Sequence, residues 1–331
     1  MMQLGETLMN ASTIRFVLPA LVASIGLEHA VHADESDTVP RYITVIHCEP
    51  QESDESEWPS LVNMIKACED RGIKACIQFS DEWIPFIVDN SARLDKIRSW
   101  RDWGHEISAH HHTLDHPSYW DGYSNDPDAA DRHGYQGDMQ DFRWLISSVL
   151  PANSRLTSIS TFDDDMPAGI PFQVGGDGGP GPDMAVSIPT LKWLTQGPAW
   201  NLTTAALEQG GTWYSDILQT IFLKTPADSV FGIAIHPHAY HEGEEAEFDA
   251  WLDFLAAQDP GGTRSATPTE ILTPYAFTAG DTNYDGTVDG SDLAMILAAW
   301  GTEDPHADLN ADRIVDGSDL ATVLANWTID G

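Results

Sequence analysis

Apolar, β-branched segments alternate with helical segments near the start of this chain, and this alternation restricts the possible folds more than any other feature. Three of the segments have the composition of buried parallel strands, and the two between them carry apolar side chains at helical spacing. The predicted order is strand 41–47, helix 59–70, strand 73–79, helix 90–104 and strand 105–109. This order predicts an α/β fold with a parallel sheet or barrel, in which functional residues gather at the carboxyl ends of the strands.

The following part of the chain continues the pattern less regularly. Two further helices and two further strands are predicted, and a glycine-rich segment is predicted to form a loop over the site. These elements are helix 140–150, strand 156–162, loop 175–181, strand 229–236 and helix 244–257.

Five of the 13 histidines lie between Gly104 and Pro117, where the third predicted strand ends. Neutral imidazole is a common zinc ligand. Residues four apart, such as His112 and His116, project from the same side of a helical turn. Glu49 follows the first predicted strand, so it should converge with these histidines at one edge of the sheet. The sequence therefore predicts a metal site at this edge.

Several segments together resemble the polysaccharide deacetylase family, whose members remove N- or O-acetyl groups from glycans with the help of a metal. The resemblance covers roughly residues 40–274, within a predicted catalytic domain at 40–275. It implies an irregular (β/α) barrel of the glycoside hydrolase and deacetylase type. The segments that carry the resemblance are 72–75, 104–107, 112–117, 235–236 and 267–272, the last of which resembles the family's closing strand.

The same resemblance implies a divalent transition metal, usually zinc in this family. Its implied ligands are His112, His116 and one carboxylate, for which this chain offers Glu49. The motif has two extra residues before His112, so His110 competes for a ligand role.

The catalytic groups are matched less completely. His236 corresponds to the family's general acid. The family has two adjacent aspartates where this chain has His47-Cys48-Glu49, so the base is either His47 or an unidentified residue such as Asp164. A platform for sugar rings is predicted near the histidines, although aromatic clusters more often belong to a core. Its residues are Tyr119, Trp120 and Tyr123, and His238, a near neighbour of His236, is a further predicted substrate-binding residue.

A duplication stands at the end of the chain, where residues 281–292 recur as 308–319. Each copy has oxygen-bearing side chains at positions 1, 3, 5, 9 and 12 of a twelve-residue calcium loop, and position 7 offers a backbone carbonyl. In the second copy Arg313 takes position 6, where the loop turns sharply. The predicted calcium ligands are Asp281, Asn283, Asp285, Thr287, Asp289, Asp292, Asp308, Asn310, Asp312, Ile314, Asp316 and Asp319.

An apolar helix ending in tryptophan follows each loop, at Trp300 and Trp327. The duplication resembles a type I dockerin, a small α-helical, EF-hand-like module. That resemblance implies two calcium ions and a cohesin-type scaffold partner. The predicted dockerin spans residues 281–331, after a linker at 276–280.

The N-terminal segment predicts export. Arg15 precedes an apolar core at 16–27, which is typical of a signal peptide, predicted here for residues 1–33, with a short leader at 34–39. The predicted location is therefore extracellular, on the cell surface or periplasmic. The net charge of −36 argues against a nucleic-acid partner, and no run is long enough for membrane insertion. Cys48 and Cys76 are expected either to pair or to remain buried thiols.

The predicted function is hydrolysis of acetyl groups on an extracellular polysaccharide by a secreted enzyme that a dockerin anchors to a scaffold or surface. Two alternatives stay open. One is a glycosidase on a similar barrel that uses carboxylates such as Glu49 and Asp164. The other is a non-catalytic glycan-binding or scaffold protein with a degenerate deacetylase domain.

Overall fold

The computed structural model describes most of the chain after the predicted signal peptide at residues 1–33. The described residues are 39–50, 55–116, 119–151, 154–161, 165–178, 190–194, 197–206, 215–227, 230–240, 245–272, 279–282, 287–304, 307–310 and 312–328.

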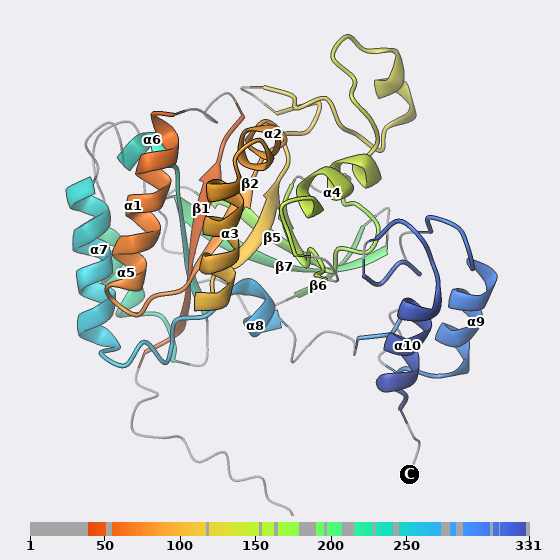
Figure 1. The fold of residues 1–331 in the computed structure, drawn as a ribbon. Helices are drawn as coiled ribbons and strands as arrows, with labels where there is room; N and C mark the ends of the chain where they lie inside the picture. The colour runs from red at the N-terminus through yellow and green to blue at the C-terminus, as the bar shows by residue number, and fades with distance from the viewer. Residues whose placement is uncertain are drawn as a thin grey trace, which may run out of the picture. The chain divides into compact units, whose positions relative to one another are not determined.

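A mainly parallel sheet is the central feature of the described residues up to 272 (Figure 1). Its strand order is β5-β4-β3-β2-β1-β8-β7-β6, and β6 runs antiparallel to β7. β5 also pairs with β7, which curls the sheet back on itself as an irregular barrel requires. The strands are β1 (Arg41–Cys48), β2 (Ala75–Phe79), β3 (Glu106–His110), β4 (Ser158–Ser160), β5 (Phe172–Gly178), β6 (Thr190–Leu194), β7 (Gly197–Ala206) and β8 (Val230–Ile235).

Helices pack on the outer face of the sheet. None of the described helices is both long and apolar enough to cross a membrane. The largest core cluster lies between the strands and the helices α1, α3, α5 and α7. The helices are α1 (Glu57–Glu69), α2 (Trp83–Val88), α3 (Ser91–Trp103), η1 (Pro127–Asp131), α4 (Met139–Ser147), α5 (Ser215–Phe222), α6 (Pro237–Ala239), α7 (Glu245–Gln258), α8 (Pro268–Leu272), α9 (Gly290–Ala298) and α10 (Gly317–Ala325).

The two faces of β1 contribute to different cores. Ile43 and Val45 belong to the inner cluster, whereas Tyr42 and Ile46 belong to the outer cluster beneath the helices. Side chains alternate between the two faces of a strand, so His47 continues the inner row. The alternation thus directs an imidazole to the inside of the curled sheet, at its carboxyl edge.

The early strands and helices confirm the predicted order, with α2 as an additional helix and boundaries shifted by at most two residues. α3 shows why its ends could be predicted. The Asn90 side chain accepts a hydrogen bond from the Ala92 N–H at 3.0 Å, and Gly104 ends the helix with a left-handed φ of 115°.

Two predicted elements differ from the structure. Residues 268–272, expected to be a closing strand, form the helix α8. The Glu106 carboxylate on β3 accepts the Thr269 N–H at 3.0 Å and the Thr269 hydroxyl at 2.9 Å, which caps this helix from 163 residues away. Most of the glycine-rich segment 175–181, expected to be a loop, belongs to β5, and the remainder lies outside the described residues.

All three cysteines are buried, and none of them forms a disulfide. Cys76 lies in the inner core, whereas Cys48 lies in the outer core. The strand register sets Cys48 opposite Phe79 and Cys76 opposite Val45. The suggested pairing of Cys48 with Cys76 is therefore wrong, because their side chains lie on opposite faces of the sheet.

The C-terminal duplication forms two equivalent halves with a core of their own. The helices α9 and α10 begin with capping boxes, at Asp289 and Asp316. The halves also pair reciprocally. The Thr328 N–H donates to the Val288 carbonyl at 2.8 Å, and the Gly301 N–H donates to the Val315 carbonyl at 2.8 Å.

Candidate metal centre

The candidate site lies at the carboxyl ends of three parallel strands. Glu49 follows β1, His110 is the last residue of β3, and His236 follows β8. β1 lies between β2 and β8 in the sheet, and β3 is the next strand after β2. Parallel strands end at one edge, so these side chains meet although up to 187 residues separate them.

Glu49 lies at the centre of the site. Its Oε1 is 2.9 Å from the His110 Nε2 and 3.0 Å from the His236 Nε2, and its Oε2 is 2.7 Å from the His112 Nε2. The Nε2 atoms of His110 and His112 are 2.9 Å apart. Four groups that are good metal ligands thus converge within contact distance of one another.

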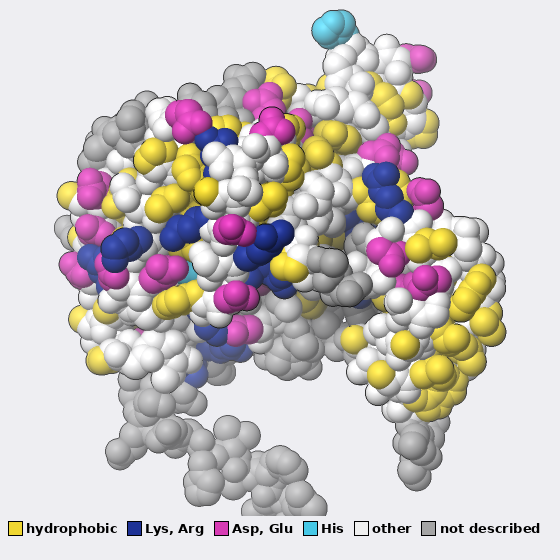
Figure 2. Space-filling model, viewed as in Figure 1, with side chains coloured by type: hydrophobic (Ala, Val, Ile, Leu, Met, Phe, Trp, Pro, Cys, Tyr) yellow, Lys and Arg dark blue, Asp and Glu magenta, His cyan; other side chains and the backbone are white. Residues whose placement is uncertain are grey.

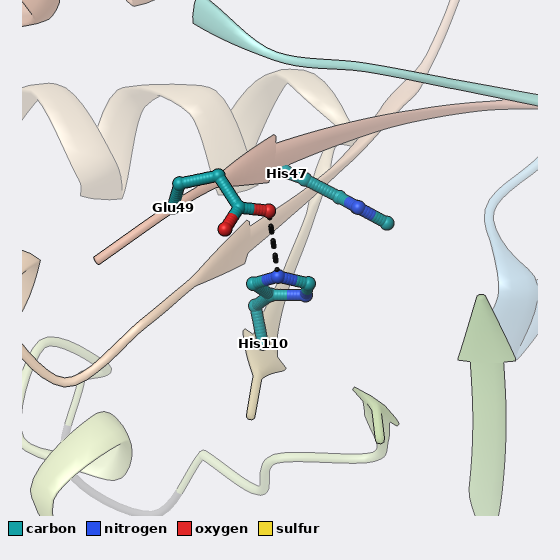
Figure 3. A group of neighbouring side chains, drawn as sticks. All are labelled: His47, Glu49 and His110. Carbon is teal, nitrogen blue, oxygen red and sulfur yellow. Dashed lines mark hydrogen bonds and ion pairs between the residues drawn. The ribbon is translucent and has the colours of Figure 1, made fainter. Parts of the chain in front are cut away.

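His47 completes this group from the inner row of β1. Figure 3 shows its ring beside Glu49 and His110, and one ligand atom from each of the three lies within 4.8 Å of the others. The His47 ring is 4.5 Å from the His110 ring and only 2% of the residue is exposed. Within the described residues, neither ring nitrogen of His47 has a hydrogen-bond partner. A bound metal would satisfy one of these buried nitrogens.

The protonation states suit a transition metal. Burial lowers the pKa of His47 well below its ordinary value, and the neighbouring His110 and His236 lower it further, so the ring is a neutral donor. Burial opposes ionisation of Glu49, but contacts with His110, His112 and His236 outweigh it and hold the pKa of this carboxyl far below its usual range. Neutral imidazoles and one carboxylate form a ligand set that zinc prefers.

Neighbouring groups orient the central side chains. The His112 Nδ1–H donates to the Tyr119 carbonyl at 3.0 Å, which leaves the Nε2 lone pair facing Glu49. The Trp83 indole N–H donates to the Glu49 carbonyl at 2.9 Å. Trp83 begins α2, a helix that the sequence analysis missed. The sequence did contain a signal for this contact, because Trp83 follows closely after the end of the predicted strand 73–79.

His116 lies beside the centre rather than on a helix with His112. A turn hydrogen bond joins the His116 N–H to the Thr113 carbonyl at 3.0 Å, and the two rings stack with centroids 3.7 Å apart. Burial and the nearby His112 lower the pKa of His116 to about 4, so it too is a neutral imidazole.

The remaining candidate residues lie around this centre. His238 stacks on His236 with ring centroids 5.2 Å apart. Tyr119 and Trp120 are partly exposed, whereas Tyr123 is a core residue whose ring packs on Phe142. Asp164, the candidate base, lies outside the described residues.

The second acidic loop is described almost completely. The Asp308 carboxylate accepts the N–H groups of Asp312 and Arg313, both at 3.1 Å, and Asp319 is fully buried. Arg313 adopts a left-handed φ of 73°, which confirms the sharp turn expected at position 6. In the first loop, Asn283 and Asp285 lie outside the described residues.

Asp81 supplies a pH-dependent prediction. Burial, Asp121 and Glu82 raise the pKa of this carboxyl from 3.8 to about 7. Between these values the folded chain binds more protons than the unfolded chain, so stability falls as pH rises. Asp81→Asn should therefore stabilise the protein, and the gain should grow by about 2 kcal/mol from pH 5 to pH 8. Denaturant unfolding at both pH values measures the gain. The exposed Asp89→Asn is the control, and an Asp81→Asn gain that does not change with pH would contradict the prediction.

No family model and no curated protein matches the chain. A structure provisionally described as a polysaccharide deacetylase, from Mycobacterium smegmatis, is 10% identical, covers 71% of this chain and 90% of its own, and has a TM-score of 0.47. The YdjI aldolase from Escherichia coli K12 is 11% identical, covers 70% and 94%, and has a TM-score of 0.24.

Proposed function

We propose that this protein is a secreted metal-dependent hydrolase that removes acetyl groups from an extracellular polysaccharide through a domain at residues 40–275. The observation that carries the proposal is the convergence of His110, His112 and His236 on the Glu49 carboxylate. The unpartnered nitrogens of His47 support it further. The glycosidase alternative requires a second carboxylate, and its candidate, Asp164, lies outside the described residues.

The metal would be held by Glu49, His110 and His112, with His47 as a further donor. When bound, zinc supplies an activated water and positive charge for the carbonyl oxygen. Among the histidines that contact Glu49, the His236 side chain is the most exposed, at 15%, against 1% for His112. His236 is therefore assigned to hold the proton that passes to the departing amine or alkoxide. His116 packs against the His112 ring and is assigned to keep that ring in place.

Product analysis tests this function. The purified full chain, loaded with zinc, should release acetate from acetylated polysaccharides such as chitin oligomers or acetylxylan without creating new reducing ends. His236→Gln should lower turnover by about 100-fold, because it removes the proton donor. New reducing ends without acetate would instead identify a glycosidase, and neither product would favour the non-catalytic alternative.

The C-terminal repeat, residues 281–331, is proposed to be a dockerin that binds calcium and a cohesin-type domain. The reciprocal pairing of the repeats and the left-handed Arg313 support this assignment. Apolar side chains gather over the C-terminal helices (Figure 2). Equivalent residues of the two copies are exposed there, namely Leu297 and Leu324 at 55% each, Trp300 at 49% and Trp327 at 38%. Exposed apolar patches of this kind mark interaction surfaces.

A further inference from the structure

His111 points away from the candidate metal centre, between two residues that point into it. His110 and His112 contact Glu49, whereas the His111 ring lies 5.4 Å from the Phe142 ring in the protein interior. The His111 Nδ1–H donates to the Asp121 Oδ2 at 2.8 Å, and both side chains are fully buried. His111 therefore lies outside the group of candidate metal ligands and forms a buried hydrogen bond with Asp121.

Asp121 also forms hydrogen bonds with both backbone groups of His112, its N–H and its carbonyl. Its Oδ2 accepts the His112 N–H at 3.0 Å, and its own N–H donates to the His112 carbonyl at 3.2 Å. Its Oδ1 accepts the Tyr123 N–H at 3.1 Å, which ties the carboxylate to the next turn. One oxygen of Asp121 thus binds the His111 ring and the His112 backbone together.

A second carboxylate supports His111 from its other nitrogen. The Asp165 Oδ2 is 3.6 Å from the His111 Nε2. Asp165 is itself fixed, because it accepts the Asn125 N–H at 2.7 Å and the Ser124 hydroxyl at 2.9 Å. The ring of His111 is therefore flanked by two carboxylates on separate segments of the chain.

We propose that Asp121 is a positioning residue for the metal centre, and this inference rests on the metal site of the proposed function. The Asp121 carboxylate acts through His112, because it fixes the His112 backbone while the Tyr119 carbonyl fixes the ring. Groups that orient metal ligands typically change metal affinity by about 10–100-fold when they are removed. The segment after the histidines thus sets zinc affinity without touching the metal.

Zinc affinity of the full chain, measured by competition with a chromophoric chelator, tests this role. Asp121→Asn should weaken zinc binding by about 10–100-fold and change the visible spectrum of the cobalt-substituted protein. Asp165→Asn weakens the outer contact of His111 and the contacts with Ser124 and Asn125 but leaves the His112 backbone held by Asp121, so a smaller loss of about threefold is expected. It also serves as the second variant should Asp121→Asn fail to fold.

Glu106→Ala is the matched control, because Glu106 is another buried carboxylate that holds backbone, at the opposite end of β3. It should lower Tm while zinc affinity stays within about twofold of the unmodified chain. Unchanged zinc affinity in Asp121→Asn, or losses that follow Tm equally in both variants, would overturn the inference. A chain that binds no zinc would overturn the metal centre together with it. Zinc binding that depends on Asp121 without acetate release would support the inference and refute only the proposed activity.

Discussion

Replacing His112 with alanine should remove both the transition metal and the hydrolase activity. His112 is 1% exposed, and its Nε2 lies 2.7 Å from the Glu49 Oε2 and 2.9 Å from the His110 Nε2. A bound metal lowers the barrier by several kcal/mol, and each 1.36 kcal/mol is a tenfold change in rate. Acetate release should therefore fall by at least about 1,000-fold.

Elemental analysis of the purified variant checks the same prediction directly. The unmodified chain should carry about one zinc, and His112→Ala should carry almost none when both are dialysed against trace metal. The exposed His133→Ala is a matched control, because it removes an imidazole that takes no part in the site. A stoichiometric zinc retained by His112→Ala would sink the proposed centre. Zinc lost while glycan binding persists, with no acetate released by the unmodified chain, would favour a non-catalytic role.

Removing calcium should unfold the C-terminal repeat. Asp308 and Asp319 are fully buried, and from residue 281 to 330 the sequence has eleven acidic side chains and one basic side chain. Without a cation these carboxylates repel one another in a small core, so the free energy of calcium binding is also free energy of folding. Calcium at a thousand times its Kd contributes about 4 kcal/mol per site, which corresponds to roughly 20 °C in Tm for a segment of this size.

Hydrogen exchange of the full chain can locate this effect. Peptides covering α9 and α10 should lose protection in a calcium chelator and regain it when calcium is restored. Asp319→Ala should produce the same loss in the presence of calcium, because Asp319 accepts the Leu309 N–H at 2.7 Å and the Asp316 N–H at 2.8 Å. Glu303→Gln, an exposed position between the repeats, is the control. Full protection of both helices in the chelator would contradict the calcium-dependent module.

The approach of Glu49 to His112 could be predicted because it depends on local pattern and on one topological rule. The alternation of strands and helices indicated parallel strands, and parallel strands bring their carboxyl ends to one edge. The outward direction of His111 could have been found in the same way, since side chains alternate along an extended chain and β3 ends at His110.

Other features depend on residues far away in the sequence. α8 begins with a local capping box, in which the Glu270 N–H donates to the Thr267 hydroxyl at 3.3 Å and the Thr267 N–H donates to the Glu270 carboxylate at 3.0 Å. The Glu106 carboxylate, 163 residues earlier, adds a partner for the N–H of Thr269. The stacking of His116 on His112 reflects a turn after Thr113 in place of the expected helical turn. The contact of Glu106 with Thr269 has no signal in the local sequence, because its two partners are far apart in the chain. Asp121 escaped notice for the same reason, because a single aspartate in a loop has no signal in the sequence until its partners are known.

The contact between Glu106 and α8 has a consequence for the order in which the barrel folds. The strand that ends in His110 is held at its beginning by Thr269, a residue near the end of the described part of the barrel. During synthesis, the chain must emerge as far as this helix before both ends of β3 have their partners. Complete packing of β3 is therefore a late step in folding, after residue 272 has left the ribosome.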